Sequence, residues 1–230
     1  MNTDSLFWLL RTHDALYPTG GHAHSSGLEA LVNEGLVADA AGLRAFLQRL
    51  VAPSLLKCDV PIFAAAWRAA ADAEPWPGIR RLALLSDALR APAELRRASA
   101  LQGRQRLLNA AALRPDGLCA RLLPVFDREG VPAAWPVAAA LDARDAGAPL
   151  EAAAAGLVYA ALSGAASAGG KLLRLGQNAL QRELAAALDA ARPGLAAALT
   201  TPVDDAGFTV PWWDLFCARH ETAAARMFLS

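Results

Sequence analysis

LYPTGGHAHSSGLE, residues 16–29, interrupts a chain that is otherwise rich in alanine and leucine at helical spacing. Pro18 fixes its own φ and moves the preceding residue out of the helical region, so a helix over residues 5–16 is expected to end here. The glycine pair that follows permits a tight reversal of the backbone, and either adjacent serine can cap the next helix, which runs to Asn33. The stretch predicts a helix–loop–helix corner of an all-helical protein or, as the alternative, a loop that binds a partner.

Apolar residues recur at helical spacing through most of the chain, and no stretch shows the alternation of a strand between hairpin turns. Proline is expected to end or kink one helix at Pro53, to open another at Pro61 and to open a third at Pro193. With 230 residues and 55% hydrophobic content, the chain can bury a sizeable core. We therefore predict one domain, residues 1–230, that folds as an all-α bundle of about eight to ten helices.

The segment Ala152–Gly170 contains no charged residue and is almost long enough to span a membrane. Its composition is dominated by alanine, glycine and serine, which give little energy of membrane insertion but let neighbouring helices approach closely. We therefore interpret it as the buried central helix of a soluble bundle. The glycine pair at its end predicts a kink or a helix end just before Lys171.

Residues 94–112 predict a second long helix, with Leu101 and Leu107 among the residues that face inward. Four arginines of this segment are expected to lie largely outside the apolar stripe, as a solvated face: Arg96, Arg97, Arg104 and Arg106. The segment also carries Glu94-Leu95-Arg96 followed by Gly103-Arg104.

The chain has 22 basic and 22 acidic residues, so its formal charge is zero. No excess of positive charge favours binding to nucleic acid or to a membrane surface. The three cysteines, Cys58, Cys119 and Cys217, are odd in number and far apart, which argues against a disulfide framework and fits a reducing cytoplasm. We expect each of them to be a small buried hydrophobic residue.

Histidine is the only residue type that suggests chemistry in this chain. His22 and His24 lie in the corner, but no nearby cysteine or carboxylate completes a tetrahedral metal site. His220-Glu221 lacks the second histidine of a metalloprotease helix, because position 224 is alanine. Neither a P-loop nor a G-x-S-x-G elbow is present. We predict no catalytic, cofactor-binding or metal-binding residues, with an enzyme that uses His22 or His24 as a base as the alternative.

Three motifs resemble those of the urease accessory protein F family (UreF). The corner is similar to P-x-G-G-[FY]-x-[HYS]-S-x-G-L-E, with His22 in place of the aromatic residue and with these matches: Pro18, Gly20, Gly21, His24, Ser25, Gly27, Leu28 and Glu29. Residues 171–177 resemble K-x-x-P-L-G-Q with Arg174 in place of proline, and residues 219–230 resemble R-H-E-x-x-x-x-R-[LM]-[FY]-x-S. These motifs follow the order that they have in the family, and together they span almost the whole chain.

The resemblance implies an all-α, homodimeric, cytoplasmic protein without catalytic activity. Such a protein bridges the urease-binding accessory protein (D or H) and the accessory GTPase (G), and the assembly delivers nickel to apo-urease. Nickel and GTP are then handled by the complex rather than bound by this chain, and neither nucleic acid nor a membrane is a partner. A direct nickel-binding chaperone is the alternative within this biology.

The resemblance also assigns partner-binding residues to the matched motifs: Pro18, Gly20, Gly21, His22, His24, Ser25, Glu29, Lys171, Gln177, His220, Glu221 and Arg226. Residues 212–228 predict a terminal helix that docks one face on the bundle. We expect this tail to fold back beside the loop Pro18–Ser25, where Arg226 holds backbone carbonyls or the carboxylate of a partner. Tail and loop together would form the surface that recruits the GTPase.

Overall fold

The computed structural model describes residues 2–14, 16–21, 24–208, 210–221 and 226–229. In these residues there is no strand, and the helices number ten when α3 to α5 are counted as one, so the all-α prediction is confirmed. The first helices are α1 (Thr3–Thr12), α2 (Leu28–Asn33), α3 (Ala40–Phe46), η2 (Leu47–Val51), α4 (Ala52–Ser54), η3 (Leu55–Asp59) and α5 (Val60–Ala69). The others are α6 (Trp76–Ala88), α7 (Ala93–Leu113), α8 (Leu118–Glu129), α9 (Trp135–Asp145), α10 (Leu150–Leu172), α11 (Gln177–Thr200), η4 (Val203–Asp205) and α12 (Pro211–His220).

One continuous helix, Ala40–Ala69, runs through α3, η2, α4, η3 and α5. Pro53 was predicted to end or kink a helix; a helix end there is wrong, and so is the new helix predicted at Pro61. The helix widens into π-helical turns on both sides of Pro53, a geometry in which hydrogen bonds reach one residue further. Pro61 has no N–H to offer the carbonyl of Lys57, and the amide of Gly207 donates to that carbonyl instead, at 3.0 Å.

The other proline prediction is also wrong, because Pro193 lies inside α11 rather than at the start of a new helix. A proline inside a helix removes one hydrogen bond and costs about 3 kcal/mol. Packing along α10 and the long helix stabilises α11 against this loss. At Gly194, one residue further on, an added Cβ would lie only 2.9 Å from Leu56 of the long helix.

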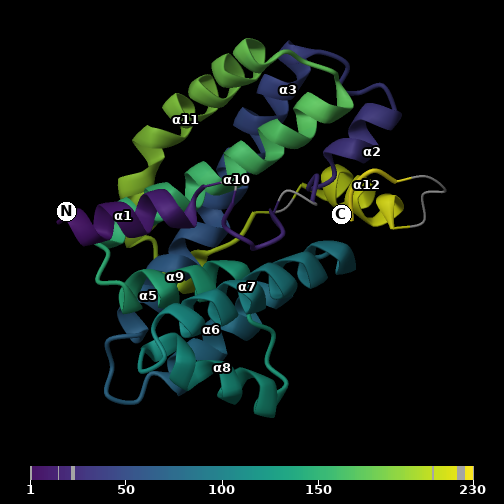
Figure 1. Ribbon diagram of the computed structural model, residues 1–230. Coiled ribbons are helices and arrows are strands. Elements are labelled where there is room, and N and C mark those ends of the chain that lie inside the picture. Colours follow the sequence, from purple (N-terminus) through teal and green to yellow (C-terminus); the bar gives the residue numbers. More distant parts are fainter. Residues whose placement is uncertain (1, 15, 22–23, 209, 222–225, 230) are drawn as a thin grey trace.

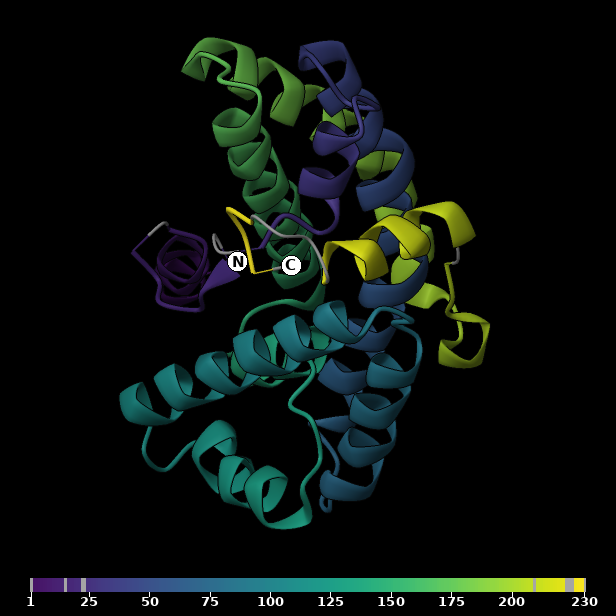
Figure 2. The same ribbon diagram turned by 90° about the vertical axis from the view of Figure 1, so that its right-hand side faces the viewer.

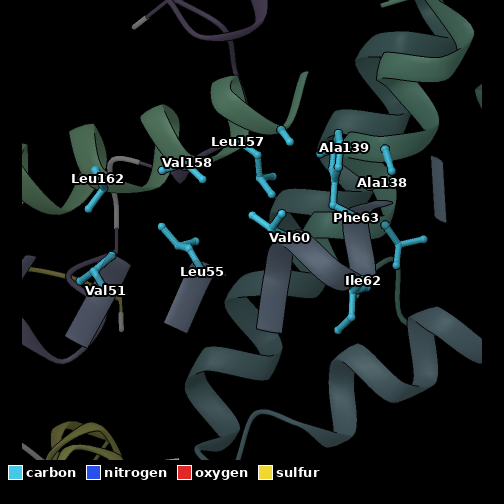
Figure 3. Packing of buried hydrophobic residues seen from close by; sticks show 14 of the residues in the cluster. Val51, Leu55, Val60, Ile62, Phe63, Ala138, Ala139, Leu157, Val158 and Leu162 are labelled. Atoms are coloured by element: carbon cyan, nitrogen blue, oxygen red, sulfur yellow. The ribbon is translucent and has the colours of Figure 1, made fainter. Parts of the chain in front are cut away.

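The hydrophobic core lies between the long helix, α9 and α10. Figure 3 shows Val51, Leu55 and Val60 of the long helix facing a row on α10 formed by Leu157, Val158 and Leu162. The prediction of a central helix from the uncharged segment is confirmed in α10, where an added Cβ at Gly169 would lie 2.6 Å from a methyl group of Leu43.

Two helices of the described residues, Ala40–Ala69 and Leu150–Leu172, are long and apolar enough to cross a membrane. The most apolar windows of these helices are 67% and 56% buried inside the protein. Core helices of soluble proteins pass the same test of length and composition, so the two helices are weak evidence for a membrane span.

The long helix joins two groups of helices (Figures 1 and 2). The first group comprises α1, α2, α10 and α11; α10 and α11 run along both halves of the long helix, and α1 and α2 pack on α10. The second group comprises α6, α7, α8 and α9, of which α6 and α9 pack directly on the second half. The last helix, α12, packs on α2 of the first group and on α7 of the second. The chain ends where the two groups meet.

The face that α7 buries includes Leu107, as predicted, but differs from the prediction at two positions. Leu101 is 65% exposed, whereas Arg106 is only 2% exposed. The cause is a close approach at Gly103, where an added Cβ would lie 1.8 Å from the carbonyl oxygen of Ala133. This contact turns α7 so that Arg106 faces the interior.

Arg106 is therefore part of a buried charge cluster between α7 and α9, formed by Arg106, Arg114, Asp142 and Asp145, which we call the Arg106 cluster. The Arg106 Nε–H donates to Asp142 Oδ2 at 3.0 Å, and Arg114 donates to Asp142 Oδ1 at 2.5 Å. Asp145 accepts from Arg114 and from the first amides of α8. The opposite charges balance inside the core.

Candidate functional site: the C-terminal tail

The C-terminal tail, Arg226–Leu229, lies against charged groups that three helices bury together. Glu29 is the second residue of α2, Glu94 is the second residue of α7, and His220 is the last residue of α12. The three side chains are 4%, 6% and 2% exposed, respectively. With Arg226 they form what we call the tail cluster.

The histidine of the tail cluster contacts both carboxylates. His220 Nε2 lies 2.9 Å from Glu29 Oε2, and His220 Nδ1 lies 2.9 Å from Glu94 Oε2. The second oxygen of Glu94, Oε1, accepts a hydrogen bond of 2.6 Å from Arg226 Nη1. The imidazole thus connects α2 with α7, and the arginine connects the tail with α7.

Backbone amides of the tail complete the coordination of Glu29. The Met227 amide donates to Oε1 at 2.6 Å and the Phe228 amide donates to Oε2 at 3.0 Å. Burial alone would raise the pKa of Glu29, but the hydrogen bonds from these amides and from His220 together hold the pKa below its usual value. Phe228 is buried, with Lys171 Nζ 5.6 Å from the centre of its ring.

The corner leads directly into this site. The Ser25 hydroxyl accepts a hydrogen bond of 3.4 Å from the Glu29 amide, but the N-cap of α2 is Gly27 rather than the predicted serine. Gly27 precedes α2 with a φ of +82°, and an added Cβ would lie 2.5 Å from the sulfur of Cys217. The Trp213 indole donates to the carbonyl of Ser26 at 3.1 Å. The corner and α12 therefore pack together through backbone contacts that leave no room for a side chain at position 27.

The beginning of the corner lies elsewhere, against α7. The carbonyl of Pro18 accepts from Asn109 at 3.2 Å, and an added Cβ at Gly21 would lie 3.5 Å from Gln102. Gly20 has a φ of +76°, as its position in a tight reversal predicts. His24 is partly buried; burial lowers the pKa of His24, and the charge of Glu94 opposes this effect.

The structure brings five of the predicted site residues together: Ser25, Glu29, Lys171, His220 and Arg226. Glu221 forms an exposed ion pair with Arg97 beside them. Gln177 is the exposed first residue of α11, and His22 lies outside the described residues. Glu29 and His220 are buried and hold the tail, so in this structure they do not face solvent.

The predicted tail is partly right. The tail folds back as predicted, but the residue that its amides contact is Glu29 of α2, which lies beyond the predicted loop Pro18–Ser25. The prediction that the terminal helix continues to Phe228 is wrong, since α12 ends at His220 and the segment 226–229 is not helical. Met227, which lies within the predicted terminal helix, is 64% exposed because its amide rather than its side chain turns inward. Arg226 binds a carboxylate of its own chain.

Sequence reasoning did not identify Glu94 as a site residue. It lies in the Glu94-Leu95-Arg96 pattern at the start of a helix, where a carboxylate is ordinarily explained by the helix dipole. Only the packing of α12 across α7 shows that it faces a histidine and an arginine.

A cavity of about 240 Å³ lies beneath the corner, between the long helix, α7 and α10. Its lining includes Tyr17, His24, Cys58 and Arg106. The buried hydroxyl of Tyr17 has no hydrogen-bond partner in the described part of the chain, and burial raises the pKa of Tyr17 to about 12. Burial raises the pKa of Cys58 to about 11, as expected for an unreactive thiol.

The fold and the tail cluster define the class: an all-α protein whose C-terminal tail is fixed by buried ion pairs to the corner after its first helix. The family model of UreF matches residues 37–188. The urease accessory protein UreF of Granulibacter bethesdensis is 36% identical over 98% of this chain and 94% of the relative. The proteins of that name from Rhodopseudomonas palustris strain TIE-1 and Brucella ovis are 33% and 31% identical, over 98% and 99% of this chain and 92% and 95% of the relatives. The chain belongs to the UreF family of urease accessory proteins.

Proposed function

We propose that this chain is a non-catalytic urease maturation factor that bridges the urease-binding accessory protein (D or H) and the accessory GTPase (G). Nickel insertion into apo-urease depends on this bridge. The observation that carries the proposal is the match to urease accessory proteins along 98% of the chain. We further propose that the chain acts as a single-domain cytoplasmic homodimer, without nucleic acid or membrane partners, and that nickel and GTP are bound by the complex it joins.

The surface proposed to recruit the GTPase consists of the tail and the loop Pro18–Ser25. Met227 and Leu229 are 64% and 65% exposed, although the backbone between them is tied to Glu29. A fixed backbone that presents exposed apolar side chains loses little conformational entropy when a partner binds. The exposed ion pair of Arg97 with Glu221 provides a polar rim beside them.

Truncation after Ala225 tests this assignment, because it removes the arginine and both amides that contact the tail cluster. We expect the truncated chain to lose capture of the purified GTPase in a pull-down while it still dimerises and binds the D or H protein. Arg81→Ala is the control, since it breaks an exposed ion pair with Asp204 elsewhere. GTPase capture by the truncated chain at the wild-type level would overturn the assignment of this surface.

A direct nickel-binding chaperone is the alternative that equilibrium dialysis distinguishes. In the part of the chain that the structure describes, no group of three or more His, Cys, Asp or Glu side chains is arranged so that it could hold a metal ion. Stoichiometric, tight binding of nickel by the isolated chain would favour the chaperone over the bridge. For a histidine-dependent enzyme, co-purification is the test, because an enzyme has no reason to capture two accessory proteins.

A further inference from the structure

A neutral imidazole carries too few N–H hydrogens to form both contacts of His220. Each ring nitrogen lies 2.9 Å from a carboxylate oxygen, so each contact needs a hydrogen between the two heavy atoms. A neutral imidazole has one N–H and one lone pair. The tail cluster is therefore complete only when it holds one additional proton.

The position of that proton follows from the other hydrogen bonds. Glu29 accepts two backbone amides, one on each oxygen, which favours its ionised form. The additional proton is therefore shared between His220 Nδ1 and Glu94 Oε2. Either location gives the tail cluster the same total charge.

We propose that His220 and Glu94 are positioning residues for the C-terminal tail, and that one proton shared between them couples its attachment to pH. The tail is attached while the pair carries the proton. It is released as the pH rises and the proton leaves. The proposal goes beyond the bridging function, because attachment can be measured in the isolated chain.

The charge balance explains the direction of the effect. With the proton present, two negative carboxylates face one imidazolium and one guanidinium, so the tail cluster is neutral. Without it, a nitrogen lone pair faces a carboxylate oxygen at 2.9 Å, and one buried negative charge has no partner. Arg226 does not offset this remaining charge, because the balance already counts its ion pair with Glu94 Oε1.

The neighbouring charged groups do not replace the missing proton. Arg97 of α7 is paired with Glu221 at the end of α12, and Lys171 of α10 lies over Phe228. The Cys217 thiol of α12 is neutral, since burial raises its pKa to about 12. His24, from the corner, interacts with Glu94, and burial lowers the pKa of His24.

The tail responds to this change because it holds both carboxylates at once. Arg226 is bonded to Glu94 of α7, whereas the amides of Met227 and Phe228 are bonded to Glu29 of α2. Repulsion within the deprotonated cluster moves His220 away from one carboxylate and separates α2 from α7. The tail cannot follow both helices, and one set of its bonds breaks.

Glu94→Gln tests the proposal, because the glutamine amide supplies the hydrogen that the shared proton supplies in the wild type. Its N–H donates to the unprotonated ring nitrogen, and its carbonyl oxygen still accepts from Arg226. The matched control is Glu183→Gln, which changes another buried carboxylate that binds Arg44, far from the tail. The fold of each variant is verified by circular dichroism.

The readout is hydrogen exchange of the Met227 and Phe228 amides between about pH 6 and about pH 9, corrected for the intrinsic pH dependence of exchange. For linkage to one proton, protection in the wild type and in Glu183→Gln should fall by up to about tenfold per pH unit. In Glu94→Gln, protection should stay constant over the same range. Constant protection in the wild type, or an unchanged pH dependence in Glu94→Gln, would overturn the proposal.

A second measurement is made on the wild-type chain. The ring ¹⁵N shifts of His220 in the wild type report how many ring nitrogens carry hydrogen, and His220→Gln identifies the signals. A doubly protonated ring, or a ring that shares a proton with Glu94, should convert to a singly protonated ring over the pH range in which amide protection falls. A ring that remains singly protonated and unshared throughout would contradict the proposal.

Discussion

The Arg106 cluster and the tail cluster both hold buried carboxylates, and both balance them with cations from neighbouring segments. They differ in the kind of cation. In the Arg106 cluster two guanidinium groups, which stay protonated at any ordinary pH, hold Asp142 and Asp145. In the tail cluster one of the two cations is an imidazole, which carries a charge only when both of its ring nitrogens are protonated.

The two clusters also differ in what they connect. All four residues of the Arg106 cluster belong to α7 and α9 or lie directly at the end of α7. The tail cluster instead joins three helices to a non-helical segment, Arg226–Leu229. The comparison indicates that a buried ionic group can be permanent or releasable, according to its cation and to the segment that it anchors.

Asp142→Asn should have the largest effect, because it leaves Arg106 buried without a compensating charge. Asp142 is fully buried and also accepts from the Trp8 indole at 3.2 Å. Loss of one member of a buried ion pair costs about 3–5 kcal/mol, to be measured as the free energy of unfolding in urea. The exposed ion pair of Arg81 with Asp204 supplies the control, since Asp204→Asn should lower the free energy of unfolding by less than about 1 kcal/mol. Equal effects of the two substitutions would mean that burial does not distinguish these pairs.

Glu29→Gln should have an intermediate effect that depends on pH. The variant loses the charged acceptor of the hydrogen bonds from two amides and an imidazole, which should lower the free energy of unfolding by about 1–3 kcal/mol. The folded state lowers the pKa of Glu29 below its unfolded value of 4.5, so the contribution is fully present above that pH and is lost as the pH falls through the folded-state pKa. The difference in unfolding free energy between wild type and variant should therefore shrink in acid. A difference that stays constant from neutral to acidic pH would contradict this reasoning.

Lys171→Ala should have the smallest effect. The ammonium group lies in the last turn of α10 and over the Phe228 ring, two contacts that are each worth up to about 1 kcal/mol at exposed positions. We expect a slightly lower melting temperature and unchanged assembly with the accessory proteins. Lys57→Ala is a matched control, because that lysine lies 5.8 Å from the ring of Phe208. If Lys171→Ala prevented assembly while the tail stayed protected from exchange, Lys171 would contact a partner directly.

The sequence predicted those features that depend on local rules. Pro18 and the glycines of the corner mark a reversal whatever surrounds them, and the uncharged small-residue segment became α10. The prolines at 53 and 193 were misjudged because tertiary packing stabilises helices that the local rule would end. Local periodicity cannot anticipate π-helical turns, because each of them inserts one extra residue into the helical repeat.

The charged sites were less predictable for a related reason. Arg106 and Glu94 lie in a helix whose rotation is set by the approach of Gly103 to the carbonyl of Ala133. No pattern within residues 94–112 shows this contact. The family motifs did place Glu29, His220 and Arg226 in one site, whereas their spacing alone shows neither their burial nor their mutual contacts.

The two hydrogen bonds from the tail to Glu29 join residues 198 and 199 positions apart. Contacts of such long range carry a large loop-closure entropy and form after the local helices during folding. Glu29 can receive these amides only when α2, α7 and α12 already lie together. The attached tail is therefore a marker of completed folding, and a chain that is still collapsing does not yet present the surface proposed to recruit the GTPase.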